Sequence, residues 1–446
     1  MDKVECIVVG AGPSGSACAL SLARKGIETV LLERGQRAGE KNVASFVLMT
    51  PVLDRLIPGF RDEAPLERLV SDHCLAYLGE KDLLQLRWRM QEHTDRGLAY
   101  TAYRSKFDAW FAGKAEEAGA ELLTGVLVTD LVFEDGKVAG VKIGDEELRA
   151  DVVVGADGIH TAVGRAAGLV TDDPRTYLLG VKEILDLPPE VIEERFQLAP
   201  GEGICYEMVG YAVEDIMGAT TLYTNQDSIS LATFGWVDQI RERGIDLHDR
   251  LQRVKQHPFV ASLIAGAELR EYQAHIISNG GRMDFSKLYS PGVLLCGEAG
   301  GFNDYAYIGV PPGMLSGMMA AETIAQARAK GDFSADALSG YITYLEKTGL
   351  ARLLHNSRAA SKYIVNHGKT NLPGYLDHLV KIMGNILEDE VTYFEPEPYP
   401  YARELYYHIA ENSVPQVLRR PIRGAIKAYA PLGSAMRRRR IRKAMR

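Results

Sequence analysis

The chain has 446 residues, of which 46% are hydrophobic and 25% charged, and its formal net charge at pH 7 is −8. This length predicts two or three domains, and this composition indicates a folded body with a large core, which excludes a disordered chain. No run of ~18 apolar residues predicts a membrane-spanning helix, and we expect no signal peptide. The five cysteines form no C-x-x-C pair, so we expect no zinc site or iron–sulfur cluster, and reduced thiols in the cytosol.

The first predicted unit is a strand, a glycine turn, a helix and a second strand. Lys3–Val9 predicts a buried parallel strand, and Gly10, Gly12 and Gly15 follow it in a G-x-G-x-x-G register. In such a unit the first glycine permits a tight turn, the second lets the backbone approach a pyrophosphate, and the third lets the helix pack on the strand. The helix N-terminus attracts the phosphates. Glu33, at the end of the second strand (Thr29–Leu32), can accept hydrogen bonds from a ribose. This pattern predicts dinucleotide binding and leaves NAD and FAD both open.

The middle of the chain alternates apolar and polar residues. "CLAYLGEKDLLQLRWR", Cys74–Arg89, and "TLYTNQDSISLATFGWV" each predict a β-hairpin, the second with its turn at Asn225–Asp227. Two further stretches place a carboxylate and glycines at the end of a predicted strand. They are Ala156-Asp157-Gly158 and Gly297-Glu298, the latter followed by a helix of small residues from about Pro312 to Ala329. Taken alone, each stretch is also compatible with an ordinary strand-to-helix turn.

The end of the chain is helical in pattern and strongly basic. Between Arg419 and Arg446 there are eleven Lys or Arg residues and no Asp or Glu. Apolar residues recur near helical spacing among them, and basic segments with an apolar face bind anionic membrane surfaces. A solvated tail and a nucleic-acid contact are the alternatives; we expect membrane attachment through 413–446 and no nucleic-acid partner. The segment Tyr393–His408, rich in aromatics and proline, predicts a linker or a docking site for another subunit.

The three strand-end motifs, in this order, resemble the FAD-dependent oxidoreductases of the p-hydroxybenzoate-hydroxylase fold, the glutathione-reductase-type flavoproteins. The resemblance implies an α/β fold and FAD as the cofactor. It implies a discontinuous FAD-binding domain and an interleaved mixed β-sheet domain for the quinone or substrate. The implied boundaries are 1–72, 101–170 and 276–345 for the FAD-binding domain, 73–100 and 171–275 for the second domain, 346–412 for a helical C-terminal region, and 413–446 for the basic tail.

The same resemblance implies which residues hold FAD. The stretch "YRSKFDAWFAGKAEEAGAELL" matches a family element whose arginine, here Arg104, lies near the cofactor. Relatives usually carry Gly-Asp where this chain has Gly297-Glu298, so the contact from Glu298 can shift. The implied FAD-binding residues are Gly10, Gly12, Pro13, Ser14, Gly15, Glu33, Arg34, Lys41, Asn42, Val43, Arg104, Val128, Ala156, Asp157, Gly158, Gly297, Glu298, Ala299, Gly309, Pro312, Gly313 and Met314.

Two long phrases, "LYTNQDSISL" and "HPFVASLIAGAELREYQAH", look like the electron transfer flavoprotein–quinone oxidoreductase family, most closely its FixC-type FAD subunits. The resemblance implies electron transfer from a reduced electron transfer flavoprotein, through FAD, to menaquinone or ubiquinone in the membrane. It implies a peripheral position on the inner face of the cell membrane. Because the cysteine cluster of single-chain relatives is absent here, it implies a separate ferredoxin-like iron–sulfur subunit. Some relatives work in complexes that also bifurcate electrons.

The chemistry implied by this resemblance belongs to the flavin, so no side chain is assigned a catalytic role and no metal is expected. The start of the helix near Pro312–Met314 would stabilise the reduced ring. The proton donor to the quinone stays unassigned, and Tyr305 and Tyr307 are better interpreted as packing residues. The alternatives are a geranylgeranyl-reductase-type prenyl reductase, an NAD(P)H-dependent aromatic hydroxylase and a non-catalytic FAD scaffold. The chain lacks the Tyr-x-Trp-x-Phe-Pro stretch usual in the prenyl reductases.

Overall fold

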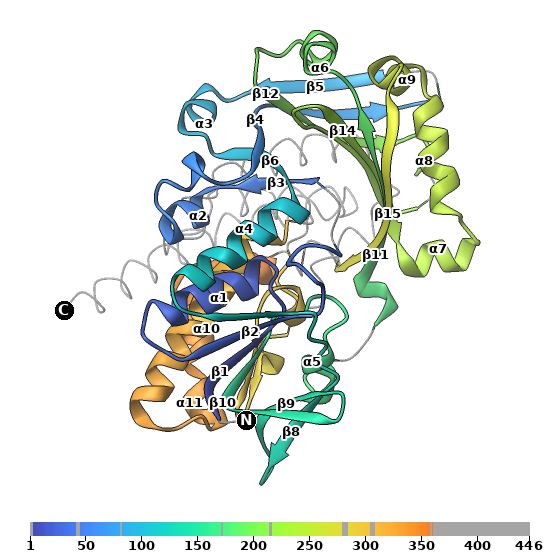
Figure 1. Cartoon of the computed structure of the whole chain (residues 1–446). Helices are drawn as coiled ribbons and strands as arrows, with labels where there is room; N and C mark the ends of the chain where they lie inside the picture. Colours follow the sequence, from blue (N-terminus) through green and yellow to red (C-terminus); the bar gives the residue numbers. More distant parts are fainter. Residues whose placement is uncertain are drawn as a thin grey trace, which may run out of the picture.

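The computed structural model describes residues 3–41, 45–80, 83–170, 173–213, 216–278, 284–303, 308–356 and 359. Two β-sheets, one above the other in Figure 1, organise this part of the chain. Asn42 and Val43, the tyrosines Tyr305 and Tyr307, the basic tail and most of the expected helical C-terminal region lie outside the described residues. None of the helices in the described ranges is both long and apolar enough to span a membrane.

The first sheet contains the predicted strand–helix–strand unit. Its main strands run in the order β16-β17-β10-β1-β2-β7, and β8 and β9 extend it. β1 pairs in parallel with β10 and β2, so three strands end at the same edge of the sheet. The bounds are β1 Val4–Val9, β2 Thr29–Glu33, β7 Glu121–Thr124, β8 Asp130–Glu134, β9 Lys137–Ile143, β10 Glu146–Gly155, β16 Tyr289–Ser290 and β17 Val293–Leu295.

The strands of this sheet are apolar on both sides because both of its faces are covered. On one face, Cys6 and Val8 pack beneath α1, α4 and α10. On the other face, Ile7 and Val9 pack beneath α5 and the β8–β9 hairpin. The helix bounds are α1 Pro13–Ala23, α4 Arg104–Glu117, α5 Ala162–Ala166, α10 Val310–Lys330, α11 Ala335–Leu338 and α12 Gly340–Lys347. The helix expected after the glycine turn is therefore present as α1, and the helix expected from about Pro312 to Ala329 is present as α10 with slightly different ends.

The second sheet is mixed. Its strand order is β15-β11-β14-β13-β12-β4-β6-β3, with β5 paired to β4. Neighbouring strands are antiparallel except for β12 and β4, which run parallel. Helices α6, α7, α8 and α9 cover one face (Figure 1), where Leu251, Ile204 and Leu231 are fully buried. The bounds are β3 Ser45–Met49, β4 Leu66–Leu78, β5 Leu83–Arg89, β6 Ala99–Tyr103, β11 Tyr177–Asp186, β12 Glu202–Gly210, β13 Gly218–Thr224, β14 Ser228–Trp236 and β15 Glu268–Ser278, with α6 Pro189–Phe196, α7 Val237–Arg243, α8 Leu247–Gln256 and α9 Pro258–Ile264.

Both predicted hairpins belong to this sheet. β13 and β14 are antiparallel on either side of Asn225–Asp227, and the Asn225 N–H donates to the Ser228 carbonyl. β4 and β5 also pair antiparallel. The second sheet also contains β3 and the start of β4. The domain boundary expected between residues 72 and 73 assigned both segments to the FAD-binding domain. These strands join the sheet through pairing with β6, a contact between segments distant in sequence. Short α2 (Pro51–Leu56) and α3 (Gln91–Arg96) connect these strands.

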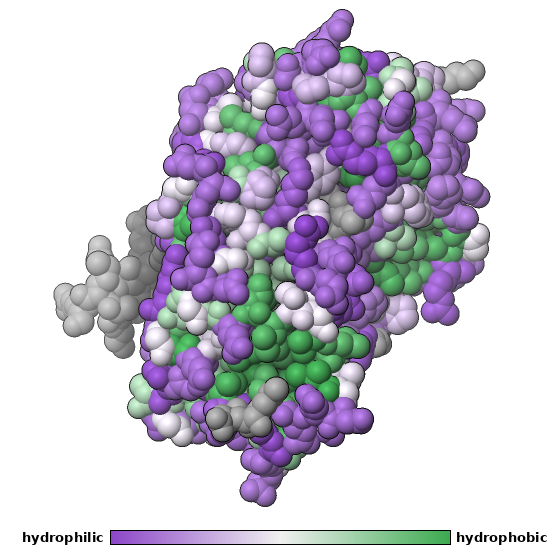
Figure 2. Space-filling view, viewed as in Figure 1, coloured by the Kyte–Doolittle hydropathy of each residue, from purple (hydrophilic) through white to green (hydrophobic). Residues whose placement is uncertain are grey.

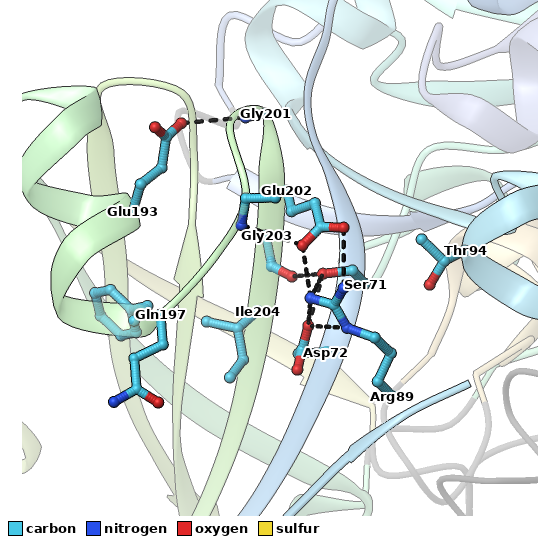
Figure 3. Close-up of polar contacts among 12 residues, drawn as sticks. Ser71, Asp72, Arg89, Thr94, Glu193, Gln197, Gly201, Glu202, Gly203 and Ile204 are labelled. Carbon is cyan, nitrogen blue, oxygen red and sulfur yellow. Dashed lines mark hydrogen bonds and ion pairs between the residues drawn. The ribbon is translucent and has the colours of Figure 1, made fainter. Parts of the chain in front are cut away.

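Arginine side chains hold the parallel β12–β4 pair. Arg68 on β4 is only 1% exposed, and it donates to the Glu202 carbonyl at 3.0 Å and the Asn225 carbonyl at 2.7 Å. Figure 3 shows Arg89 between Asp72 and the Glu202 carboxylate, which it reaches at 2.6 Å. Burial opposes the ionisation of Asp72, but hydrogen bonds from Ser71 and two arginines outweigh it and lower its pKa. These carboxylates are fully paired, which favours a structural role for them.

Candidate functional site

The turn between β1 and α1 shows a different constraint at each glycine of the motif. A Cβ on Gly15 would lie 1.8 Å from the Gly10 carbonyl oxygen, and one on Gly10 would lie 2.6 Å from that of Ala156. Neither site can hold a side chain. A Cβ on Gly12 would meet only Arg104 Nη2, at 3.8 Å. Because Gly12 caps α1 without a side-chain hydrogen bond, the N–H groups of the first turn stay available to an anion.

Glu33 is held at the end of β2 by the same turn. Its Oε2 accepts from the Ala11 N–H at 3.1 Å, and its Oε1 accepts from the Gly35 N–H at 2.8 Å. Each carboxylate oxygen keeps a further lone pair for a ribose hydroxyl. Arg34 and Lys41 are exposed on the segment that follows, and the Lys41 carbonyl accepts from Gln273. Their side chains therefore lie at the surface.

The Asp157 motif lies beside this turn because β10 is the parallel neighbour of β1, with Val9 opposite Gly155. Asp157 Oδ2 accepts from the Val163 N–H at 3.1 Å, whereas its buried Oδ1 has no hydrogen-bond partner among the described residues. Burial raises the pKa of this carboxyl. A ligand or an ordered water can supply the missing partner of such a buried oxygen. The side chain of Val128 packs in the apolar core on the face of the first sheet that α5 covers.

The third motif brings α10 against α1. Gly297 has φ +58°, and a Cβ there would lie 2.0 Å from Ser14 Oγ. A Cβ on Gly317 would lie 2.2 Å from the Ser14 carbonyl oxygen, and one on Gly313 would lie 3.6 Å from Ser14 Cβ. Glycine is therefore needed for two helix N-termini to meet at one place. Both N-termini carry partial positive charge.

Glu298 is held by the second sheet. Its Oε1 accepts from the Ser278 N–H at 2.9 Å, at the end of β15, and Asn303 Nδ2 donates to the Ser278 carbonyl at 2.8 Å. Glu298 thus joins the two sheets. The remaining residues expected around this motif are buried or lie at the start of a helix: Pro13, Ala299, Gly309, Pro312 and Met314.

Cationic side chains gather where the two sheets meet. Arg104, the first residue of α4, is oriented by the buried Asp108, which accepts from its Nε and Nη2, each at 2.8 Å. This leaves Arg104 Nη1 without a hydrogen bond among the described residues. Burial, together with the charge of Arg104, lowers the pKa of Lys182 on β11 to about 8. An anionic group at this junction would offset the repulsion between these cations.

The face of the second sheet opposite α6–α9 carries an apolar cluster. Met49, Val70, Ala99 and Cys205 are buried there, and the cluster extends to Ile308. Ile308 precedes Gly309, the cap of α10, so this face lies against the start of α10. The other partly buried members of the cluster are Val47, Trp88, Met90 and Tyr223.

Sequence reasoning missed the ionisable groups on this face. Glu207 lies between Tyr206 and Met208 on β12, and burial raises its pKa to about 8. A single glutamate within "GICYEMVG" is the signal that could have drawn attention to it. His73 is 3% exposed and stacks on Trp88 with ring centroids 5.5 Å apart. Neither His73 ring nitrogen has a hydrogen-bond partner among the described residues.

Known proteins resemble this chain over most of its length. A sequence model of the family described as FAD dependent oxidoreductase matches residues 5–172. A protein of Escherichia coli K12 named "Probable electron transfer flavoprotein-quinone oxidoreductase YdiS" is 34% identical over 429 residues, which cover 95% of this chain and 99% of that one. Protein FixC of Bradyrhizobium diazoefficiens is 35% identical over 398 residues, covering 88% of this chain and 92% of that one.

Solved structures share the fold. A geranylgeranyl bacteriochlorophyll reductase-like protein of Thermoplasma acidophilum has a TM-score of 0.69 at 21% identity, and the alignment covers 92% of this chain and all of that one. The flavin-dependent brominase Bmp2 has a TM-score of 0.68 at 18% identity and matching coverage of 92% and 99%. The predicted α/β flavoprotein fold and the FAD cofactor are thereby confirmed. This chain belongs to the FixC and electron transfer flavoprotein–quinone oxidoreductase family of FAD-dependent oxidoreductases.

Proposed function

We propose that this protein passes electrons from a reduced electron transfer flavoprotein, through FAD, to a membrane quinone, either menaquinone or ubiquinone. The observation that carries this proposal is the apolar cluster around Met49, Cys205 and Ile308, which lies between the second sheet and the start of α10. A quinone head group is a flat, largely apolar ring with polar oxygens, and such ligands bind in apolar sites that contain a few placed polar groups. The naming of the relative YdiS supports the same assignment.

The three strand-end motifs would hold the cofactor, which supplies a ring that accepts and releases two electrons. The open backbone at Gly12 and the first turn of α1 suit the pyrophosphate. Glu33 suits a ribose hydroxyl, Arg104 suits a phosphate through its free nitrogen, and the unpartnered oxygen of Asp157 suits a hydroxyl donor. The N-terminus of α10 would stabilise negative charge on the ring. The other residues named from the sequence remain proposed contacts.

A peripheral position on the inner face of the cell membrane is part of the proposal. Strand β5 lies at an edge of the second sheet, and three of its leucines are 41 to 49% exposed: Leu83, Leu84 and Leu86. Such a strand could rest on lipid near the quinone. The basic segment 413–446 would add attraction to anionic lipids. A ferredoxin-like iron–sulfur subunit and a multi-subunit, electron-bifurcating assembly are further partners we propose from the family resemblance.

Anaerobic stopped-flow spectroscopy of the FAD-loaded protein tests this function. We expect reduced electron transfer flavoprotein to bleach the flavin absorbance, and a soluble menaquinone or ubiquinone analogue to restore it. NADPH and a geranylgeranyl substrate serve as the alternative donor and acceptor. Reduction by NADPH with an aromatic acid would favour a hydroxylase, reoxidation by the prenyl substrate alone would favour a prenyl reductase, and a flavin that no donor reduces would favour a scaffold. Each of these results would contradict the proposal.

A further inference from the structure

We propose that Glu207 and Lys182, which share one row of the second sheet beside the apolar cluster, donate the two protons that the quinone takes up. This proposal rests on the proposed function, because it needs a quinone at that face. It assigns catalytic roles to two side chains on different strands, β12 and β11. It also supplies the proton donor that the sequence left unassigned.

The strand register places both side chains on one row of the sheet. Lys182 pairs with Ala232, Ala232 with Thr221, and Thr221 with Glu207. Residues directly opposite each other in a sheet point to the same face. Three strand spacings separate the two backbones by about 14 Å. Ala232 and Thr221 carry small side chains in this row, and Tyr223 borders it, with its ring 5.0 Å from Lys182 Nζ and its hydroxyl accepting from Thr221 Oγ1 at 3.2 Å. A long lysine and a glutamate can therefore flank a planar ring, one at each end.

This row faces the proposed ring site. Glu207 lies two residues from Cys205, a member of the apolar cluster that includes Ile308 at the start of α10. The intervening Tyr206 and the next residue, Met208, point to the other face and pack beneath the covering helices. Lys182 Nζ donates to the Ser45 carbonyl at 2.8 Å. Two of the three ammonium protons of Lys182 remain available for a ligand.

Glu207 differs from the other acidic side chains buried in this sheet. Asp72 is paired with two arginines, and Glu183 is paired with Lys255 at 2.6 Å. Among the described residues, Glu207 has no ion pair, and its one hydrogen-bond partner is the thiol of Cys205 at 3.9 Å. Burial of a carboxyl group that has no ion-pair partner favours its protonated form.

Few charged or titratable groups face this carboxyl. They are Cys205 on its own strand, Tyr223 on β13 and Lys182 on β11. Burial raises the pKa of Glu207 to about 8 and lowers that of Lys182 to about 8, with Arg104 of α4 adding to the second effect. Both groups thus carry a proton at neutral pH, and both have a pKa near the working pH, where proton transfer is most efficient.

The proton and electron balance is complete. Reduction of a quinone takes two electrons, which reduced FAD supplies, and two protons. The Glu207 carboxyl gives one proton to one quinone oxygen, and the Lys182 ammonium gives one to the other, so two O–H bonds form as one O–H and one N–H bond break. A carboxylate and an amine remain, and both regain protons from solvent. The oxygens of a para-quinone lie at opposite ends of the ring, which matches donors on two sides.

The first test measures the protonation state without turnover. In infrared spectra of the oxidised, FAD-loaded protein, we expect a protonated-carboxyl band that disappears with a midpoint near pH 8 and is absent from Glu207→Gln. Glu190→Gln, which changes an exposed residue of α6, is the matched control and should keep the band. If the wild-type band already disappears near pH 4 to 5, the proton-donor role is overturned.

The second test separates proton transfer from electron transfer. Protein reduced in advance is mixed with a soluble quinone or with ferricyanide, which accepts electrons without protons. We expect Glu207→Gln and Lys182→Met to slow reoxidation by quinone by about 10²- to 10⁴-fold, the range of general acid catalysis. Reoxidation by ferricyanide should not change, and Glu207→Asp should recover part of the quinone rate. Equal slowing with both oxidants, or a wild-type quinone rate in Glu207→Gln, would overturn the donor role. A wild-type protein that ferricyanide reoxidises and quinone does not would overturn the proposed function, and the donor role with it.

Discussion

A methyl group at Gly12 tests the proposed phosphate site without disturbing the fold. In Gly12→Ala the new Cβ would meet only Arg104 Nη2, at 3.8 Å, which is ordinary van der Waals contact, and Gly12 has φ −73°, which alanine adopts freely. Alanine is a poorer N-cap than glycine, so α1 loses about 0.5–1 kcal/mol. Part of this loss is offset because alanine restricts the unfolded chain. We expect the free energy of unfolding to change by less than about 1 kcal/mol.

FAD affinity should respond much more strongly to this change. The methyl group occupies the side from which a pyrophosphate would approach the first-turn N–H groups. Losing one hydrogen bond to a charged group reduces the binding free energy by about 1.5–3 kcal/mol. This raises the dissociation constant for FAD by about 10- to 150-fold. Flavin fluorescence quenching, with FAD titrated into apoprotein, measures this constant, and thermal unfolding reports the fold.

Two other glycines provide the controls for Gly12→Ala. Gly113→Ala places a methyl group in open space on α4, and it should leave FAD affinity unchanged. Gly15→Ala would place a Cβ 1.8 Å from the Gly10 carbonyl oxygen, and it should prevent folding of the unit. If Gly12→Ala folds and binds FAD as tightly as the wild type, the pyrophosphate does not lie at this turn.

Three further changes test the packing and the buried charges. In Gly317→Leu the new Cβ would lie only 2.2 Å from the Ser14 carbonyl oxygen. Chemical denaturation should therefore show that the free energy of unfolding falls by more than about 3 kcal/mol, or that no folded protein forms. Near-wild-type stability would contradict the α1–α10 packing. Arg68→Met leaves buried carbonyls without hydrogen-bond donors. In the same assay the free energy of unfolding should fall by about 3–5 kcal/mol. A fall of less than about 1 kcal/mol would show that these hydrogen bonds contribute little. Burial lowers the pKa of His73 to about 4, so from pH 6.5 down to pH 4 the unfolded chain binds a proton that the folded chain does not, and stability falls as the pH falls. His73→Phe should flatten the stability curve across that window, and an unchanged slope would contradict a neutral, buried His73.

Local pattern was enough to predict the first unit of the fold. Gly10, Gly12 and Gly15 lie within six residues of one another, and the turn they form depends on backbone geometry that the sequence encodes directly. The position of Glu33 was predictable as well, because the next strand is short and parallel to the first. The hairpin at Asn225–Asp227 was predictable for the same reason, since turn residues and alternation are local signals.

Contacts between segments distant in sequence could not be predicted from the local sequence pattern. The approach of Gly297 and Gly317 to Ser14 depends on how α10 crosses α1, and no local feature specifies that crossing. Glu298 bonds to Ser278 because the end of β15 lies beside the glycine loop. Glu207 and Lys182 share a row only through the register of four strands, since three strand pairings are needed to relate one residue to the other.

A crystal structure of the FAD complex is the measurement that tests the central claim most directly. We expect the pyrophosphate at hydrogen-bonding distance from the first-turn N–H groups of α1, with the isoalloxazine ring between the start of α10 and the face that carries Lys182 and Glu207. Density for the ring on the other face of the second sheet, beneath α6–α9, or for FAD away from Gly12, would contradict it.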